Sequence, residues 1–198
     1  MKEKYSSIYI THDTTMREYK WLVPEYPNNE SLSFYRNYFN DAVKDTSITI
    51  KHYKDLSLPL KWTPIYKIKK DYYLYGPSDW MFNLGYIISD STIIRQYSDG
   101  PDVMVILDYM QVSAHKYYFK ALTNFKKIIE LTIYIIDHKN NIAVWEFTID
   151  NKNYYELNVS SDNIAHFPLV NCDCREVKCL IEYEFKQPDY KKLIYGIE

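Results

Sequence analysis

Between residues 128 and 149 the chain alternates apolar and polar side chains in two runs with a polar stretch between them. The first run repeats an apolar side chain at every second position, at Leu131, Ile133 and Ile135. A period of two places successive side chains on opposite faces of a strand. The intervening residues 137–141 are of types that favour turns. The pattern therefore predicts a β-hairpin.

Other segments show the same two-residue period or the longer period of a helix. Apolar residues spaced by three and four, such as Leu32, Tyr35 and Phe39, predict an amphipathic helix over 31–44, with Ser31 as its N-cap. A short C-terminal helix is predicted over 189–195 and a helical turn after Ser160. Strands are predicted at 5–11, 47–53, 65–75, 86–88, 92–97, 103–109, 115–122, 154–159 and 179–185.

From about residue 65 onward these strands follow one another without helices between them. Alternating strands and helices would indicate a parallel sheet, whereas successive short strands indicate antiparallel pairing. We therefore predict a mainly β protein, either an antiparallel β-sandwich or a strongly curved antiparallel sheet, with an N-terminal and a short C-terminal helix. Residues 1–198 are expected to form one domain; the alternative is an N-terminal lobe, 1–60, packed on a β-domain, 61–198.

Composition excludes several classes of function. The 198 residues include only four glycines, and none lies in a phosphate-binding loop or a nucleophile turn, so nucleotide-binding folds and α/β-hydrolases are not expected. A net charge of -2 gives no basis for binding nucleic acid. No apolar run reaches the ~18 residues of a membrane span. The polar first residues lack the apolar core of a signal peptide, which predicts a cytoplasmic protein.

Three cysteines and a histidine near the C-terminus are the first candidate for chemistry. Cys172, Cys174 and Cys179, with His166 upstream, offer the donor types of a zinc site. Structural zinc sites use two separated pairs of ligands, and this C-x-C-x4-C spacing does not match that arrangement. Free cytosolic thiols are the favoured interpretation, and we predict no cofactor.

A series of aspartates is the second candidate, because carboxylates that converge at one edge could bind a cation or act as an acid–base pair. Aspartate is also a common turn residue, since its side chain accepts hydrogen bonds from nearby backbone amides. The turn interpretation is favoured for most members of the series: Asp71, Asp79, Asp90, Asp99, Asp102 and Asp108.

An aromatic set over residues 62–80 is the third candidate. On an extended segment Tyr73 and Tyr75 share one face and Tyr72 lies on the other. Exposed aromatic side chains could stack on sugars or anchor a protein interface, whereas burial in the core is the alternative. Trp80 follows a turn sequence and is expected to be the most exposed member. The whole set is Trp62, Tyr66, Tyr72, Tyr73, Tyr75 and Trp80.

Because no catalytic motif is present, the leading hypothesis is a non-catalytic domain that binds another protein, possibly a basic one. Immunity proteins that neutralise toxins by covering a surface share its small size, acidity and lack of motifs. A carbohydrate-binding module that uses the same aromatics is the alternative, and a metal-dependent enzyme is the least favoured. The proposed contact residues are Trp80, Tyr73, Tyr75, Asp79 and Asp71.

Overall fold

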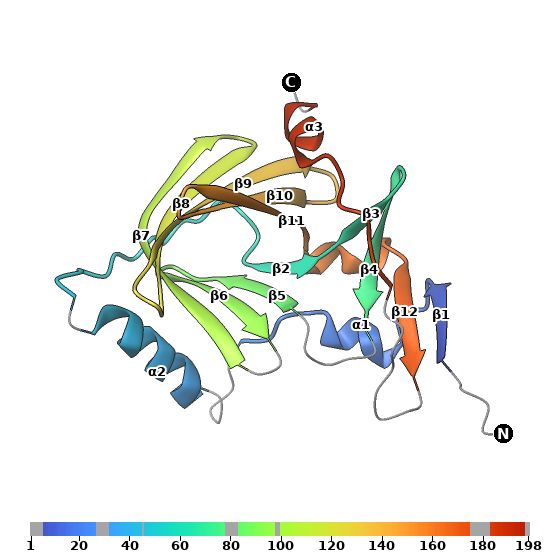
Figure 1. The fold of residues 1–198 in the computed structure, drawn as a ribbon, viewed down its shortest axis with the longest axis horizontal. Coiled ribbons are helices and arrows are strands. Elements are labelled where there is room, and N and C mark those ends of the chain that lie inside the picture. Colours follow the sequence, from blue (N-terminus) through green and yellow to red (C-terminus); the bar gives the residue numbers. More distant parts are fainter. Residues whose placement is uncertain are drawn as a thin grey trace.

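The computed structural model describes residues 6–26, 32–44, 46–77, 83–97, 100–174 and 183–196. Its largest unit is a closed barrel of eight antiparallel strands (Figure 1). Around the barrel the strands follow chain order, and the first closes it by pairing with both the last and the second. These strands are β2 (Lys61–Pro64), β5 (Asn83–Ile88), β6 (Thr92–Tyr97), β7 (Gly100–Ser113), β8 (Lys116–Thr123), β9 (Ile128–Asp137), β10 (Ile142–Ile149) and β11 (Lys152–Ser160).

A second, four-stranded sheet lies beside the barrel, in the order β1-β12-β4-β3 (Figure 1). Its strands are β1 (Ser6–Thr11), β3 (Tyr66–Ile68), β4 (Asp71–Gly76) and β12 (Leu169–Cys174). β12 pairs antiparallel with β1 and parallel with β4. The helices are α1 (Arg17–Trp21), α2 (Leu32–Val43), the 3-10 helix η1 (Ser161–His166) and α3 (Tyr190–Tyr195).

The predicted hairpin forms β9 and β10, with Ile133 opposite Trp145 and Leu131 opposite Phe147. The polar residues between the two strands form a turn, as predicted. The Asp137 carboxylate accepts hydrogen bonds from the Asn140 backbone and side-chain amides at 3.0 and 2.7 Å. The hairpin forms two neighbouring strands of the barrel wall, and the face that carries these four apolar side chains points into the barrel.

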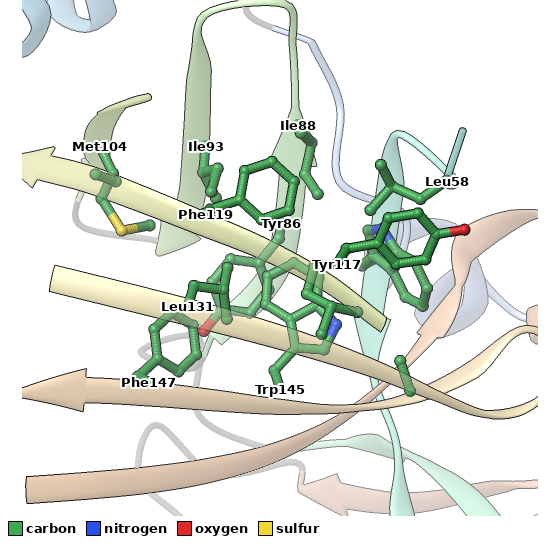
Figure 2. Packing of buried hydrophobic residues seen from close by; sticks show 14 of the residues in the cluster. Leu58, Tyr86, Ile88, Ile93, Met104, Tyr117, Phe119, Leu131, Trp145 and Phe147 are labelled. Carbon is green, nitrogen blue, oxygen red and sulfur yellow. The ribbon is translucent and has the colours of Figure 1, made fainter. Parts of the chain in front are cut away.

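Large side chains fill much of the barrel interior. Figure 2 shows Tyr86 of β5 and Trp145 and Phe147 of β10 packed with Phe119 of β8 and Leu131 of β9. Trp145 is fully buried, with its ring centroid 4.5 Å from that of Tyr86. An eight-stranded barrel is just wide enough for side chains to fill it or for one small ligand to enter. Most of this interior is therefore a packed core.

Two further groups of apolar residues cover the outside of the barrel. Ile142, Val144 and Leu157 face outward from β10 and β11 and pack with Leu74 and Leu169 of the second sheet. On another side α2 packs against β7, and Ala42 is in the same buried cluster as Val105. Successive residues of a strand such as β10 therefore pack alternately in the barrel interior and in the apolar cluster outside it.

The closure between β2 and β5 requires a glycine. Gly85 has φ +123°, and a Cβ atom there would lie 2.2 Å from the Trp62 carbonyl oxygen. The register between β5 and β6 is also irregular between Asn83 and Gly85. Glycine allows this conformation and close approach because it has no Cβ.

Comparison with the predictions confirms a mainly β fold with antiparallel sheets, whereas a sandwich is not confirmed. Segment 47–53 is not a strand: Ile48 and Ile50 pack against the α2 cluster without a neighbouring ladder. Segment 58–64, where no strand was predicted, contains β2, and β12 was not predicted either. The expectation of purely antiparallel pairing was wrong for β4 and β12. Of the predicted strand 179–185, only 183–185 are described, and they are not in a strand.

Candidate functional site

Charged residues occupy inward-facing positions at one end of the barrel. On β6, Arg95 follows the buried Ile93 by two residues and therefore faces inward with it. On β11, Glu156 lies opposite the inward-facing Trp145. Asp102 of β7 lies opposite Arg95 and precedes the inward-facing Met104 by two. The strand period thus brings one guanidinium and two carboxylates into the barrel from three strands.

Arg95 and Glu156 form an ion pair with Nη2 and Oε1 2.8 Å apart, and both side chains are largely buried. The Tyr86 hydroxyl donates to the other carboxylate oxygen of Glu156 at 2.6 Å. The Arg95 guanidinium also lies 4.8 Å from the centroid of the Tyr97 ring and 5.5 Å from that of Tyr86. Two aromatic rings and a carboxylate therefore surround this one cation.

Burial of this cluster shifts its titrations. Burial raises the pKa of the Tyr86 hydroxyl well above its usual value, and the neighbouring Glu156 charge raises it further. Burial alone would lower the pKa of Arg95, but contact with Tyr86 and Glu156 outweighs it and the net pKa is raised. The guanidinium therefore stays charged and the phenol stays neutral at physiological pH.

A recess of about 320 Å³ opens over this cluster. Its charged wall carries Arg95, Asp102 and Glu156, and the apolar side chains around it come from β7, β9 and β10. Ligand sites in proteins are concave, about 300–1,000 Å³ in volume, and mainly apolar with a few placed polar groups, and barrel mouths are common locations. The apolar lining residues are Met104, Ile129, Phe147 and Ile149.

Two exposed aromatic side chains stand at the edge of the recess. Phe125, in the turn between β8 and β9, is 76% exposed, and Tyr154 of β11 is 52% exposed. Large exposed aromatics beside a concave, partly apolar surface are a common feature of binding sites. They extend the apolar surface of the recess outward.

A smaller cavity of about 200 Å³ lies on the other side of the ion pair, and it too is lined by Arg95 and Glu156. Tyr66 and Tyr190 line it from β3 and α3. Burial, with the Glu156 charge as the second cause, raises the pKa of each of these phenols to about 12. The ion pair thus lies between an inner recess and an outer cavity beneath the C-terminal segment.

The predicted contact residues that the structure describes do not line the recess. Tyr73 and Tyr75 share one face of β4, as expected, but Tyr75 is only 6% exposed and packs with Tyr66 and Phe185. Asp71 is exposed at the start of β4. Asp79 and Trp80 lie outside the described residues. The structure therefore brings Tyr73 and Tyr75 together in a small core.

The residues considered as weak metal ligands differ in their exposure to solvent. His166 is exposed at the end of η1, whereas Cys172 is buried and its Sγ lies 3.4 Å from the Tyr75 hydroxyl. The side chains of Cys174 and Cys179 lie outside the described residues. Within the described ranges, no three His, Cys, Asp or Glu side chains are grouped so that they could hold a metal ion.

Among the members of the aspartate series that the structure describes, only Asp102 lines the recess. Asp90 instead bonds to the His52 ring at 2.7 Å and to the Ser91 hydroxyl at 2.9 Å, an exposed pairing that sequence reasoning did not predict. Arg95 and Glu156 were also missed. The signal was present, because each places a charge where the alternation of its strand calls for a side chain that faces the core.

Comparison with known proteins identifies no relative: no protein-family model, curated protein or solved structure matches the chain. Among the described residues, no helix has both the length and the apolar character needed to cross a membrane.

Proposed function

We propose that this protein is a non-catalytic binding protein that takes a small amphipathic molecule into the open end of its barrel. The observation that carries the proposal is the recess of about 320 Å³, in which charged side chains and apolar side chains line the same space. Such a surface offers apolar burial to one end of a ligand and polar contacts to the other. A cytoplasmic location remains part of this proposal.

The ion pair supports a binding role because its contribution to stability is small. Burying two charges costs desolvation energy that their attraction only partly repays, so an apolar pair of the same size is often at least as stable. Arg95 and Glu156 nevertheless occupy inward positions within a largely apolar interior. A polar contact to a ligand is a physical reason for charges at this place.

Binding can be tested with the neutral fluorescent probe N-phenyl-1-naphthylamine, whose emission rises in apolar surroundings. Saturable binding of one probe molecule per chain is expected. Ile149→Trp should fill the recess and weaken binding at least about tenfold, because the added ring occupies the ligand's space. Ile128→Trp is the matched control: Ile128 is exposed on the neighbouring strand and does not line the recess. No saturable binding, or equal binding by both variants, would overturn the proposal.

The carbohydrate-binding alternative is decided in the same assay. Phe125 and Tyr154 offer aromatic faces that could stack on a sugar ring. Displacement of the probe by neutral mono- or disaccharides would favour that class of ligand, and failure of every sugar to displace it would remove the alternative.

A second candidate is the binding of a partner protein, for which an immunity-type function is one form. The observation in its favour is β1, which is an edge strand of its sheet within the described part of the chain. Ile8, Tyr9 and Ile10 of this strand are all exposed, and β1 contains neither proline nor a charged residue. An exposed apolar edge without such residues is suited to pairing with an extended segment of another protein.

Ile10→Lys tests this second candidate, since a lysine on an edge strand opposes further pairing. A stoichiometric partner recovered from the native organism with the wild-type protein should be lost with Ile10→Lys and retained with Ile128→Lys. Retention of the partner by Ile10→Lys would show that β1 is not the contact.

A further inference from the structure

The charge of the recess indicates which class of ligand it takes. Charged side chains reach it from three of its elements: Arg95 from β6, Asp102 from β7 and Glu156 from β11. The residues that line it from β8, β9, β10 and their turns are uncharged. Close in sequence to the lining residues Phe125 and Ile149, Lys127 and Asp150 form an exposed ion pair of zero net charge, with Nζ and Oδ2 2.8 Å apart. The formal charge of the lining is therefore -1.

Arg95, the one cation among the described residues that line the recess, is already engaged. The Arg95 guanidinium is bound to Glu156 at 2.8 Å and faces the rings of Tyr86 and Tyr97. An anionic ligand would have to compete with Glu156 for this guanidinium while lying near Asp102. Like charges at close range in a partly desolvated site oppose binding, so the arrangement disfavours a carboxylate or phosphate.

The charge of the recess favours a cationic ligand. It adds a positive charge to a lining whose formal charge is negative, and it lies near the aromatic side chains Phe125 and Tyr154, whose ring faces attract cations. Its apolar part can rest against Phe147 and Ile149. Charge, aromatic edge and apolar wall therefore favour the same kind of molecule.

We infer that the recess at the open end of the barrel binds a small amphipathic ammonium ion, with its apolar body against Phe147 and Ile149 and its charged group toward Asp102 and Glu156. This inference rests on the proposed function, because it names the class of ligand for the same site. It adds a prediction that the general proposal lacks: the site discriminates between ligands of one shape by the sign of their charge.

Three compounds of nearly the same shape test the inference at pH 7 by displacement of N-phenyl-1-naphthylamine. They are 2-phenylethylamine, which is a cation, 2-phenylethanol, which is neutral, and phenylacetate, which is an anion. The amine should displace the probe at a concentration at least about tenfold lower than the acid, as expected for a charge a few ångström away in a partly desolvated site. The alcohol should lie between them.

Asp102→Asn keeps the size of the side chain and removes one negative charge. It should reduce the preference for the amine over the alcohol about fivefold or more, with little effect on the alcohol itself. Asp108→Asn is the control on the same strand, because Asp108 is exposed, pairs with Lys51 and does not line the recess. It should leave the preference unchanged.

The outcomes separate the two proposals. Probe binding without discrimination by charge, or with preference for phenylacetate, would overturn the ammonium inference and leave the binding function standing. Equal effects of Asp102→Asn and Asp108→Asn would also overturn it. Failure of the probe to bind at all would remove the proposed function and the inference with it.

Discussion

At the scale of single residues, Arg95, Glu156 and Tyr86 form a hydrogen-bonded polar group within a largely apolar barrel interior. Each lies where the period of its strand points a side chain inward, and each finds its partner on a strand distant in sequence. The Glu156 carboxylate accepts hydrogen bonds from Arg95 Nη2 and the Tyr86 hydroxyl, which offsets part of the cost of burying these charges, although Arg95 Nε has no hydrogen-bond partner. Removing one member leaves the others buried with less compensation.

The ion pair gives the first prediction. Arg95→Met and Glu156→Gln should each lower the free energy of unfolding by about 2 kcal/mol, less than for a fully buried pair because both side chains keep some exposure. The double variant should lose clearly less than the sum, since no unpaired charge remains. Urea denaturation of the four proteins measures the coupling. Additive losses would show that the two side chains stabilise the fold independently.

At the scale of elements, alternation of apolar and polar residues predicted a strand correctly only where a neighbouring strand was available for pairing. β9 and β10 pair along their length, and one set of their apolar residues, such as Ile133 and Trp145, faces the barrel interior. Segment 47–53 alternates as clearly, yet it packs over α2 and the barrel without a ladder. A strand needs a partner for its backbone groups, and the sequence of one segment does not reveal whether a partner lies beside it.

The two faces of β9 give the second prediction. Ile133→Ala should cost about 3 kcal/mol, because Ile133 is fully buried and its loss leaves a cavity. Ile128→Ala on the same strand should change the free energy of unfolding by less than about 0.5 kcal/mol, because Ile128 is 54% exposed. Chemical denaturation measures both. Similar losses for the two variants would contradict the assignment of β9 to the barrel wall.

At the scale of the whole molecule, closure depends on the four residues of β2. This strand is the first of the barrel, and it closes the barrel by pairing with both the last strand, β11, and the second, β5. The sequence did not predict β2, because the strand is short and its segment contains prolines at positions 59 and 64. The C-terminal segment then covers the outer wall near the ion pair, where Tyr190 stacks on Tyr155 with ring centroids 5.4 Å apart.

The buried phenols of this region give the third prediction. Tyr66 and Tyr190 have pKa values raised from 10.0 to about 12, so in this range the unfolded chain releases protons more readily than the folded one. Their contribution to stability is complete below pH 10 and is lost as the pH rises toward 12. At pH 11 the contribution of Tyr66 should have fallen by on the order of 1 kcal/mol, and that of the more exposed Tyr190 by less, because solvent screens its charge.

Calorimetry from pH 9 to pH 12 should show the melting temperature falling over this interval, and Tyr66→Phe should make the fall shallower. Absorbance at 295 nm follows tyrosinate formation in parallel. A melting temperature that does not change between pH 10 and pH 12 would contradict buried positions for these phenols.

The candidate site was predictable only in part. Asp102 was named within the aspartate series, but nothing in the sequence distinguished it from Asp90 or Asp108. Tyr75 was chosen because it shares one face of an extended aromatic segment with Tyr73, and its burial depends on Tyr66 and Phe185, which are brought beside it by other segments. Exposure is a property of the surroundings of a residue, so its own type and neighbours in sequence predict it poorly.

The sequence by itself determined the local features of this protein: the hairpin of β9 and β10, most of the other strands, α2, α3 and the predominance of antiparallel pairing. These follow from side-chain period, turn residues and caps, which act over a few residues. Only the tertiary structure decided that the strands close into a barrel, that β4 and β12 run parallel, and that Arg95, Asp102 and Glu156 share a recess. Those outcomes depend on contacts between distant segments, whose register and partners are set by the packing of the whole chain.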